Sequence, residues 1–357
     1  MRVKLIIASD STDSDNKVPV DNLLQKLHKN WEHYQLAVTA EDNKNSTAAK
    51  KPLKVIVCVS GGSDSVALLH LLQRQRTLLN LEPHLLHFNH QLRPEADHEQ
   101  DFVHALADQY EIPFHHKTAK HLKSGQSALQ ESARDWRIEE SCRLLKHLGG
   151  GRIATGHQAD DQLETLLLKL LRGTHISNLQ GMQWTNEDFI RPLLNCRKTE
   201  LQEYLKSNQL TWLEDTSNQS TAYLRNRVRL ELIPLLEELT RQGLHSRIND
   251  LSEQSRLLRE FLDSDYKSWQ QNHKNSAANS QDVLPVKILQ QANDLLQQEI
   301  LHDFITARTG QALSFRKLQN IIIQLRTGSN LWEMHLSQKW KICKSGEELC
   351  LQQNQQP

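Results

Sequence analysis

The chain has 357 residues, which is enough for two domains and a sizeable core. Its 43 Lys and Arg residues balance 43 Asp and Glu residues, so its composition does not indicate a globally basic nucleic-acid-binding protein, although a local basic face is compatible with it. Hydrophobic residues make up 38% and aromatic residues 5% of the chain, which predicts a polar, mostly helical protein. No apolar run reaches the ~18 residues of a membrane span.

The five cysteines form no Cys-x-x-Cys pair, so neither a zinc ribbon nor a disulfide framework is predicted. The apolar stretch at the N-terminus is too short for a signal peptide. These patterns predict a reduced, cytoplasmic protein with no membrane partner. A homodimer is compatible with the sequence, which does not fix the oligomeric state.

Residues 1–50 are predicted to form an N-terminal extension and linker. The apolar spacing from Val20 to Leu36 predicts an amphipathic helix that docks on the rest of the chain. The segment AEDNKNSTAAKK that follows has the composition of a linker. We expect no catalytic role for this part.

The chain is organised around the segment KVIVCVSGGSDS at residues 54–65. The apolar, β-branched run Val55–Val59 predicts a buried strand, and the run after Ser65 predicts a helix. A strand, a Gly-Gly turn and a helix N-terminus together form a cradle for an anion, because backbone N–H groups can approach it closely. The alternative is a tight turn without a ligand. Hydroxyls and a carboxylate in the same turn favour phosphate and Mg²⁺, with the metal on Asp64.

This turn is neither a Walker-type P-loop nor a dinucleotide fingerprint, since both consensus patterns are absent. The pattern SGGxDS resembles the pyrophosphate loop of the N-type ATP pyrophosphatases. Members of that family split ATP into AMP and pyrophosphate while they adenylate a substrate oxygen. The resemblance implies that ATP contacts the loop residues, which are Ser60, Gly61, Gly62, Ser63, Asp64 and Ser65.

Polar side chains follow two further predicted strands. His87 and Asn89 end the strand over 83–90, and His157 ends the strand over 151–157. Ligands of open α/β sheets collect at the carboxyl ends of the strands. We therefore expect these three side chains to contact the nucleotide or to orient a loop beside it.

Two arginines share one face of the long helix predicted over Ser127–Leu148. Arg134 and Arg137 are three residues apart, so their side chains lie on the same side of that helix. A solvated charged face is the simpler interpretation. The alternative is a phosphate-facing pair, because the guanidinium fork binds phosphate through two hydrogen bonds.

Three acids open the helix that follows residue 158. One of Asp160 and Asp161 can cap this helix, and acids in a first turn complement its dipole. Asp161 and Glu164, however, lie three residues apart and so share a face at the ligand-binding edge of the sheet. Such a pair can bind a cationic amine, share a metal or act as a base. This spacing favours Asp161 over Asp160 as the substrate contact without excluding Asp160.

The residue pattern of the last third of the chain differs from that of the part before it. Arg225, Arg227 and Arg229 predict a phosphate or RNA surface, with a solvated helix face as the alternative. Helices are expected from about Leu230, including one over 284–306 and one over 313–325, and a β-hairpin over 334–353. We therefore predict an α/β catalytic domain over 51–235, built on a Rossmann-like open parallel sheet. A smaller, helix-rich domain for binding tRNA or substrate is predicted over 236–357.

A set of motifs, in order, resembles the tRNA(Ile)-lysidine synthetases. The set covers roughly residues 54–230: SGGSDS at 60–65, HFNHQLR at 87–93, the Glu131/Arg134/Arg137 cluster, TGHQADDQLET at 155–165, Arg172-Gly173, IRPL at 190–193, and EDTSN with LRNRVR at 214–229. Residues 240–357 match the substrate-binding appendage of the family only loosely. The first 50 residues have no assigned counterpart.

The resemblance implies a ligase that uses ATP and Mg²⁺. Its members convert the wobble cytidine of the CAU-anticodon isoleucine tRNA into lysidine with free lysine, and release AMP and pyrophosphate. Asp161 and Glu164 correspond to carboxylates implicated in lysine handling, and Arg134 to an arginine that guards the ATP or lysine path. Asp64, Asp161, Glu164 and Arg134 are thus the expected catalytic residues, and Arg225, Arg227 and Arg229 the expected tRNA contacts.

Three other functions remain open. A tRNA thiolase would carry cysteines at motif spacing, which this sequence lacks, and an amidotransferase-coupled synthetase would carry a glutaminase segment, which is not evident. A non-catalytic nucleotide sensor or RNA-binding adaptor predicts loss of Asp64, Asp161 or Glu164. All three carboxylates are present.

Overall fold

The computed structural model describes residues 4–6, 20–39, 51–91, 96–119, 129–174, 176–214, 224–241, 243–273, 283–310 and 313–354. The contacts divide the chain into two compact units. Unit 1 comprises Met1–Thr165 and Gly181–His245, and unit 2 comprises Leu166–Gln180 and Ser246–Pro357. Each unit has its own hydrophobic core.

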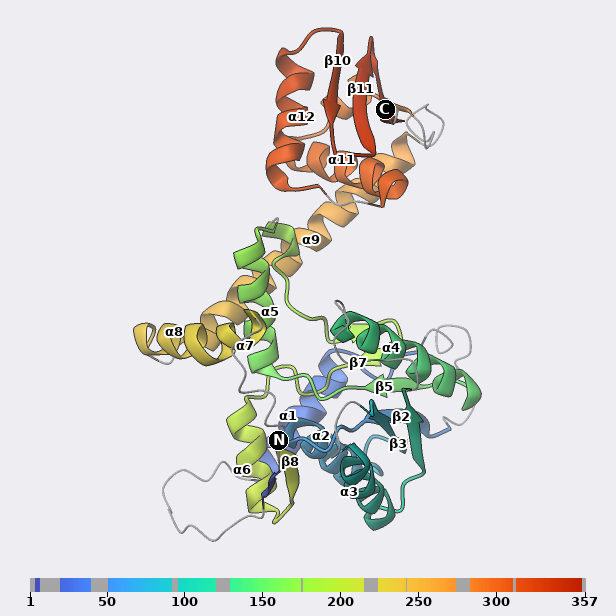
Figure 1. Cartoon of the computed structure of the whole chain (residues 1–357), viewed down its shortest axis with the longest axis vertical. Coiled ribbons are helices and arrows are strands. Elements are labelled where there is room, and N and C mark those ends of the chain that lie inside the picture. Colours follow the sequence, from blue (N-terminus) through green and yellow to red (C-terminus); the bar gives the residue numbers. More distant parts are fainter. Residues whose placement is uncertain are drawn as a thin grey trace. The chain divides into compact units, whose positions relative to one another are not determined.

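Unit 1 is built on a six-stranded sheet with the order β4-β3-β2-β5-β7-β6 (Figure 1). Its strands are β2 Leu53–Cys58, β3 Leu81–Asn89, β4 Phe114–Thr118, β5 Arg152–Ala154, β6 Thr185–Asn186 and β7 Phe189–Ile190. All neighbours pair in parallel except β6 with β7, which are antiparallel. The predicted Rossmann-like open sheet is therefore confirmed.

Helices cover both faces of this sheet. They are α1 Val20–His33, α2 Ser63–Arg74, α3 Ala96–Gln109, α4 Leu129–His147 and α6 Lys198–Ser207. Successive strand residues point to opposite faces, so β2 sends Val55 and Val57 to one side and Ile56 to the other. Val55 and Val57 share a core with α1, α2, α3 and α6. Ile56 packs in a second core with Leu144 and Leu145 of α4.

The helix α1 belongs to the core of unit 1. Leu27 and Trp31 are buried in the same cluster as β2 and α2, as the apolar spacing predicted. Lys26 forms an ion pair with Glu200 of α6 at 3.1 Å, and the Asn30 side chain donates a hydrogen bond to the Pro192 carbonyl at 3.0 Å. The predicted linker lies largely outside the described residues.

The strand order places two loops next to each other. The chain winds from β2 to β3 and β4 and then returns to β5 on the other side of β2, so the winding reverses at the carboxyl end of β2. Ligands of open α/β sheets bind at such a switch point. The loops after β2 and β5 touch here: a Cβ atom on Gly156 would lie 3.1 Å from the backbone of Asp64 and of Ser65.

A second small sheet in unit 1 joins β1 Lys4–Ile6 to β8 Trp212–Glu214 in antiparallel register. After β8, the described chain resumes with α7 Leu224–Arg227, a π-helical turn Val228–Leu232 and α8 Ile233–Leu239. The helix α5 Ala159–Arg172 begins in unit 1 and ends in unit 2.

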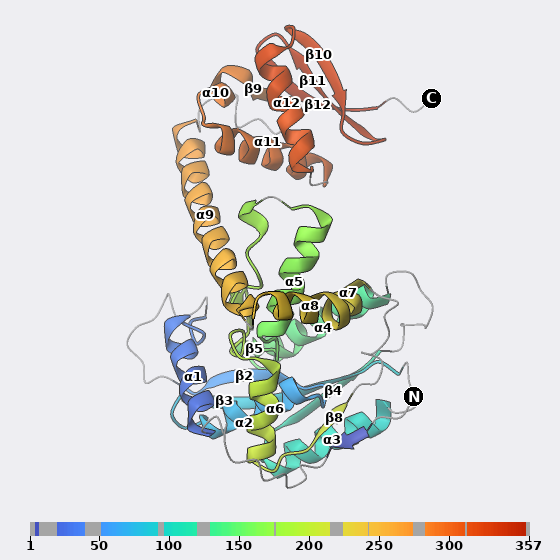
Figure 2. The same cartoon turned by 90° about the vertical axis from the view of Figure 1, so that its left-hand side faces the viewer.

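Unit 2 combines helices with a four-stranded antiparallel sheet (Figure 2). Its remaining elements are the 3₁₀ turn Ile176–Asn178, α9 Leu244–Asn272 (from Ser246 on), β9 Val283–Pro285, α10 Val286–Gln290, α11 Asp294–Thr309, α12 Phe315–Thr327, β10 Leu331–His335, β11 Trp340–Ser345 and β12 Glu348–Gln353. The sheet order is β10-β11-β12-β9. The predicted hairpin is present as β11 and β12, and two further strands extend it.

The single helix predicted over 284–306 is wrong. Leu284 pairs with Leu349 as part of β9, and Pro285 ends that strand. Two helices follow, α10 and α11. Asn293 is the N-cap of α11, and its side chain accepts a hydrogen bond from the Leu296 amide at 2.9 Å. Proline and an Asx cap are local signals that divide this leucine-rich run.

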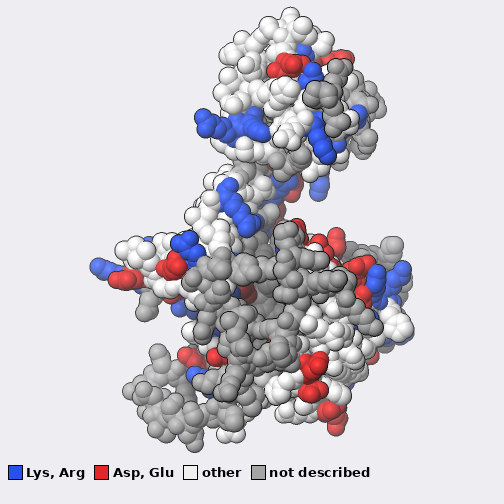
Figure 3. All heavy atoms as spheres, viewed as in Figure 1, with Lys and Arg blue, Asp and Glu red and all other residues white. Residues whose placement is uncertain are grey.

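Acidic and basic side chains are interspersed on the face shown in Figure 3, in keeping with the net charge of zero. Of the helices within the described ranges, none combines the length and the apolar character that crossing a membrane requires.

Leu27→Ala tests whether α1 supports unit 1. The side chain is fully buried, so its truncation is expected to lower the free energy of unfolding by about 2–5 kcal/mol. Gln25→Ala on the exposed side of the same helix is the control and is expected to change it by less than about 0.5 kcal/mol. Equal unfolding midpoints in urea for both variants would contradict this role.

Candidate active site

The turn after β2 is shaped by its own serine hydroxyls. The Ser65 hydroxyl donates to the Gly62 carbonyl at 2.9 Å and accepts from the Ser60 amide at 3.2 Å. Gly61 has a φ of +90°, which a residue with a side chain rarely adopts. The hydrogen bonds of the serine hydroxyls thus hold the loop in its shape.

The N-terminus of α2 is open to an anion. Gly62 is the N-cap residue, and no side chain caps the helix. The first amides of a helix lack intrahelical acceptors and carry the positive end of its dipole. A phosphate group at this point would accept hydrogen bonds from them.

Asp64 lies in the first turn of α2. Burial raises the pKa of its carboxyl, while the charge of Lys198 and a hydrogen bond from the Ser63 hydroxyl at 3.1 Å act in the opposite direction. A hard carboxylate oxygen is a suitable ligand for Mg²⁺. Within the described ranges, no group of three or more His, Cys, Asp or Glu residues could hold a metal by itself. Protein-bound Mg²⁺ usually takes one or two carboxylates and completes its coordination with substrate phosphates and water.

His87 and Asn89 occupy buried positions at the carboxyl end of β3. The His87 Nδ1 atom is 2.9 Å from the Val59 carbonyl, which ties β3 to the strand that leads into the turn. The Asn89 side chain donates to Asp97 at 2.9 Å and accepts from the Gln91 amide at 2.9 Å. These contacts correspond to the loop-orienting role that the sequence left open for both residues.

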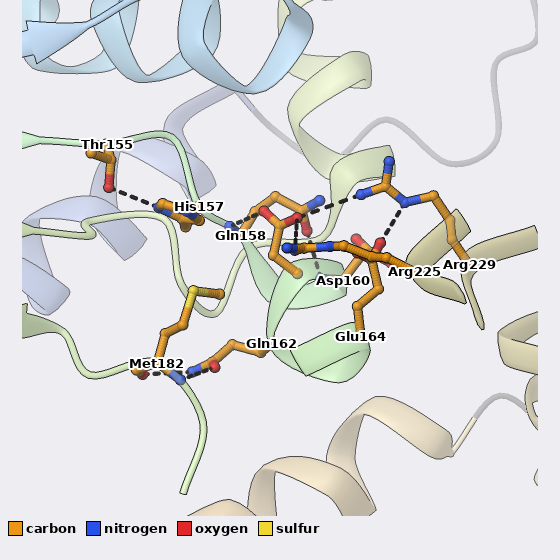
Figure 4. Close-up of polar contacts among 10 residues, drawn as sticks. Thr155, His157, Gln158, Asp160, Gln162, Glu164, Met182, Arg225 and Arg229 are labelled. Carbon is orange, nitrogen blue, oxygen red and sulfur yellow. Dashed lines mark hydrogen bonds and ion pairs between the residues drawn. The ribbon is translucent and has the colours of Figure 1, made fainter. Parts of the chain in front are cut away.

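His157 lies in a strongly basic environment after β5. Its Nδ1 atom is 2.9 Å from the Thr155 hydroxyl (Figure 4). Burial, and then the charges of Arg191, Arg225, Arg137 and Arg134, lower its pKa to about 4. The imidazole is therefore neutral at physiological pH, and it can accept or donate one hydrogen bond without adding charge.

Three of the arginines whose charges act on this histidine, Arg134, Arg137 and Arg191, are called the arginine cluster below. Burial, together with the charge of Arg134, lowers the pKa of both Arg137 and Arg191. Like charges held together in this way favour the binding of an anion.

The sequence prediction included Arg134 but not Arg137 or Arg191 among the site residues. Arg137 shares a helix face with Arg134, which was a usable signal. Arg191 follows β7, the strand beside β5, so the carboxyl end of that strand also points to this place. Arg191 reaches the site because β7 pairs with β5, and that strand order cannot be inferred from the sequence.

The Asp160 carboxylate contacts the start of α6 and His245. Its carboxylate accepts a hydrogen bond from the Lys198 amide at 2.9 Å, at the start of α6, and lies 3.3 Å from the His245 Nε2 atom. An acid at a helix N-terminus stabilises that helix. Asp160 thus connects α5 to two other parts of unit 1.

Asp161 and Glu164 form an ion-pair network with two arginines, which is called the carboxylate–arginine network below. Figure 4 shows Glu164 with Arg225 and Arg229. Arg225 donates through Nε to Glu164 at 2.8 Å, and its terminal nitrogen is 3.5 Å from Asp161. Arg229 also donates through Nε to Glu164, and it lies 3.6 Å from Asp161. Glu164 is 0% exposed, so both of its oxygens are paired inside the protein.

The Asp161 carboxyl has a raised pKa. Burial, followed by the charge of Glu164, raises its pKa to about 6. Because this value lies above the ordinary 3.8, the folded protein takes up the proton first as the pH falls. Ionisation of Asp161 therefore costs folding stability as the pH rises from about 4 to about 6.

Arg227, the third arginine predicted to contact tRNA, pairs with a different acid from Arg225 and Arg229. Arg227 pairs with Glu231 at 3.1 Å, and both side chains are more than half exposed. It therefore does not take part in the network that holds Arg225 and Arg229. The EDTSN residues from Asp215 onward, and Arg93 of the HFNHQLR motif, lie outside the described residues.

Comparison with protein families gives a match to the PP-loop domain over residues 33–236, more than half of the chain. The chain belongs to the PP-loop domain family. The predicted pyrophosphate loop, residues 60–65, lies within this matched range. The family that the SGGxDS pattern indicated is confirmed.

Curated relatives point to one branch of the family. The tRNA(Ile)-lysidine synthase of Enterococcus faecalis is 31% identical over 313 residues, which cover 84% of this chain and 66% of that protein. The enzyme of the same name from Porphyromonas gingivalis is 38% identical over 190 residues, covering 52% of this chain and 41% of that protein. The chain thus spans less than two thirds of the length of these relatives.

Among solved structures, the U34-tRNA thiolase NcsA from Methanococcus maripaludis superposes with a TM-score of 0.52. The alignment covers 69% of this chain and 82% of that chain at 16% identity. This likeness concerns the fold alone.

Glu164→Gln tests the carboxylate–arginine network. Removing one charge of a buried ion pair leaves its partners uncompensated, and we expect a loss of about 3–5 kcal/mol in the free energy of unfolding. Glu231→Gln breaks the exposed pair with Arg227 and is the matched control, with an expected change below about 1 kcal/mol. Similar losses for the two variants in chemical denaturation would show that burial of Glu164 is not important.

Proposed function

We propose that the protein ligates lysine onto carbon 2 of the wobble cytidine of the CAU-anticodon isoleucine tRNA. ATP first adenylates the cytidine, and lysine then displaces AMP. The observation that carries this proposal is the switch point, where the PP-loop touches the segment that leads into the buried acids of α5. The names of the curated relatives support the choice of substrates.

ATP is proposed to bind with its phosphates at residues 60–65 and the arginine cluster. The open helix N-terminus supplies hydrogen-bond donors, and the guanidiniums supply positive charge for the leaving pyrophosphate. Mg²⁺ on Asp64 would offset the charge of the same phosphates when bound. His157, which is neutral, would lie beside them as a hydrogen-bonding group.

Lysine is proposed to bind through its ε-ammonium to Asp161 and Glu164. Free lysine has a side-chain pKa of ~10.4, so it arrives as a cation and must lose a proton before it attacks. The pKa of Asp161, about 6, makes this carboxylate a stronger base than an ordinary aspartate. It can therefore attract the ammonium and assist in removing its proton.

The arginines of the network already neutralise these carboxylates. Arg225 is half exposed, so its side chain is free to turn toward solvent when another cation takes its place on Asp161. We propose that the lysine ammonium exchanges with this guanidinium.

The released Arg225, together with Arg229 and the exposed Arg227, would then contact the tRNA backbone. The target cytidine lies in a loop, which makes its unstacking inexpensive. Residues 236–357 are proposed to bind more distant parts of the tRNA.

The proposal is tested with ATP, Mg²⁺, labelled lysine and an isoleucine tRNA that carries the CAU anticodon. Label is expected to enter this tRNA, with release of AMP and pyrophosphate, and not a control tRNA whose wobble cytidine is changed. ATP cleavage without lysine transfer would assign the chain to another adenylating enzyme of the family. Absence of any ATP turnover would favour a nucleotide-binding adaptor.

Asp161→Asn and Asp160→Asn separate the two neighbouring acids. Asp161→Asn is expected to lower the rate of lysine transfer by at least ~100-fold, because it removes both the ammonium contact and the base. Asp160→Asn keeps the network intact and is expected to change that rate by less than ~10-fold. Single-turnover assays with both variants measure the difference, and the reverse order of effects would reassign the lysine contact to Asp160.

Lysine binding is expected to weaken in acid. Asp161 takes up a proton below its pKa of about 6, and each pH unit below that value should lower the affinity for lysine by up to ~10-fold. Calorimetric titration of lysine between about pH 5 and about pH 8 measures this change. Asp161→Asn is expected to bind lysine weakly and with a flat pH profile; an equally steep profile in this variant would exclude Asp161 as the titrating group.

A further inference from the structure

Two cysteines of unit 2 lie directly opposite each other in the β11–β12 hairpin. Cys343 of β11 pairs with Cys350 of β12 in the antiparallel register. Opposite residues of antiparallel strands have Cα atoms about 4.5–5.5 Å apart. That separation falls within the ~4.4–6.8 Å that a disulfide bond spans.

The side chains of this pair point to the same face of the sheet. Ile342 and Leu349, which belong to the other face, are fully buried, whereas both cysteines are partly exposed. The Cys343 thiol donates to the Gln352 side-chain oxygen at 3.5 Å, and the amide of Gln352 donates to the Cys350 sulfur at 3.8 Å.

The surroundings favour covalent chemistry over metal binding. In the described part of the chain, no third His, Cys, Asp or Glu completes a metal site with these sulfurs. The other three cysteines, Cys58, Cys142 and Cys196, all lie in unit 1. Cys343 and Cys350 therefore have each other as reaction partner.

We propose that Cys343 and Cys350 form a reversible dithiol–disulfide site that is oxidised by peroxides. One thiolate attacks a peroxide oxygen and becomes a sulfenic acid, with release of one water (or alcohol) molecule. The second sulfur then attacks the sulfenic acid, forms the S–S bond and releases a second water. The two thiols lose two electrons, which reduce the peroxide, and a small thiol reverses the reaction by exchange.

The bond would connect the two central strands of the unit 2 sheet. In the order β10-β11-β12-β9, the hairpin that carries both cysteines lies between the two edge strands. Burial and the neighbouring Cys350 raise the pKa of Cys343, so the thiolate is scarce and oxidation is expected to be slow. Once formed, the disulfide should protect the hairpin amides from exchange with solvent.

The test is peptide mapping of the full chain after treatment with hydrogen peroxide and blocking of residual thiols. Trypsin cleaves after Lys341 and Lys344, so the two cysteines separate into peptides 342–344 and 345–357 unless a disulfide joins them. We expect the joined pair, lighter by two hydrogens than the sum of its parts, and its loss on treatment with dithiothreitol. Slower amide hydrogen exchange in residues 340–353 of the oxidised protein is the second readout.

Cys343→Ser and Cys350→Ser are each expected to abolish the joined peptides. Cys142→Ser, which removes a partly exposed thiol of unit 1, is the matched control and should leave them unchanged. Recovery of the two peptides unjoined, with sulfinic acid on either cysteine, would overturn the proposal. So would joined peptides that come only from covalent dimers, as shown by non-reducing electrophoresis.

Discussion

The site depends on the burial of Glu164. A fully buried carboxylate is costly unless its charge is paired, because the protein interior solvates ions poorly. Arg225 and Arg229 supply that pairing from a segment more than 60 residues further along the chain. The network therefore fixes the π-helical turn that carries Arg229 against α5, and it sets the position of Asp161 beside it.

This arrangement balances charge locally. Two carboxylates and two guanidiniums neutralise each other in the carboxylate–arginine network, while the arginine cluster adds positive charge near His157. An anion is attracted to the cluster, and a cation can enter the network only by exchange with a guanidinium. The two halves of the proposed reaction, phosphate departure and amine attack, thus have different environments: a positive one at the cluster and a neutral one at the network.

Close packing of two loops connects these environments. Gly156 lies against the backbone of Asp64 and Ser65, so a side chain there would push the PP-loop away from the segment that leads into α5. The serine hydroxyls of the turn hold its shape from within. The distance between the phosphate cradle and the buried acids is therefore set by backbone contact, which is less variable than side-chain contact.

The sequence by itself determined the elements whose signals are local. The apolar strand, the Gly-Gly turn and the helix after it identified the PP-loop, and the three-residue spacing of Asp161 and Glu164 placed both on one helix face. Only the tertiary structure decided what those residues contact. Asp160 and Asp161 are adjacent and chemically identical, yet one caps α6 and the other joins the network. Arg191 joined the cluster, and Arg225 and Arg229 paired with acids, because strand order and long-range packing brought distant segments together, and no local pattern encodes those contacts.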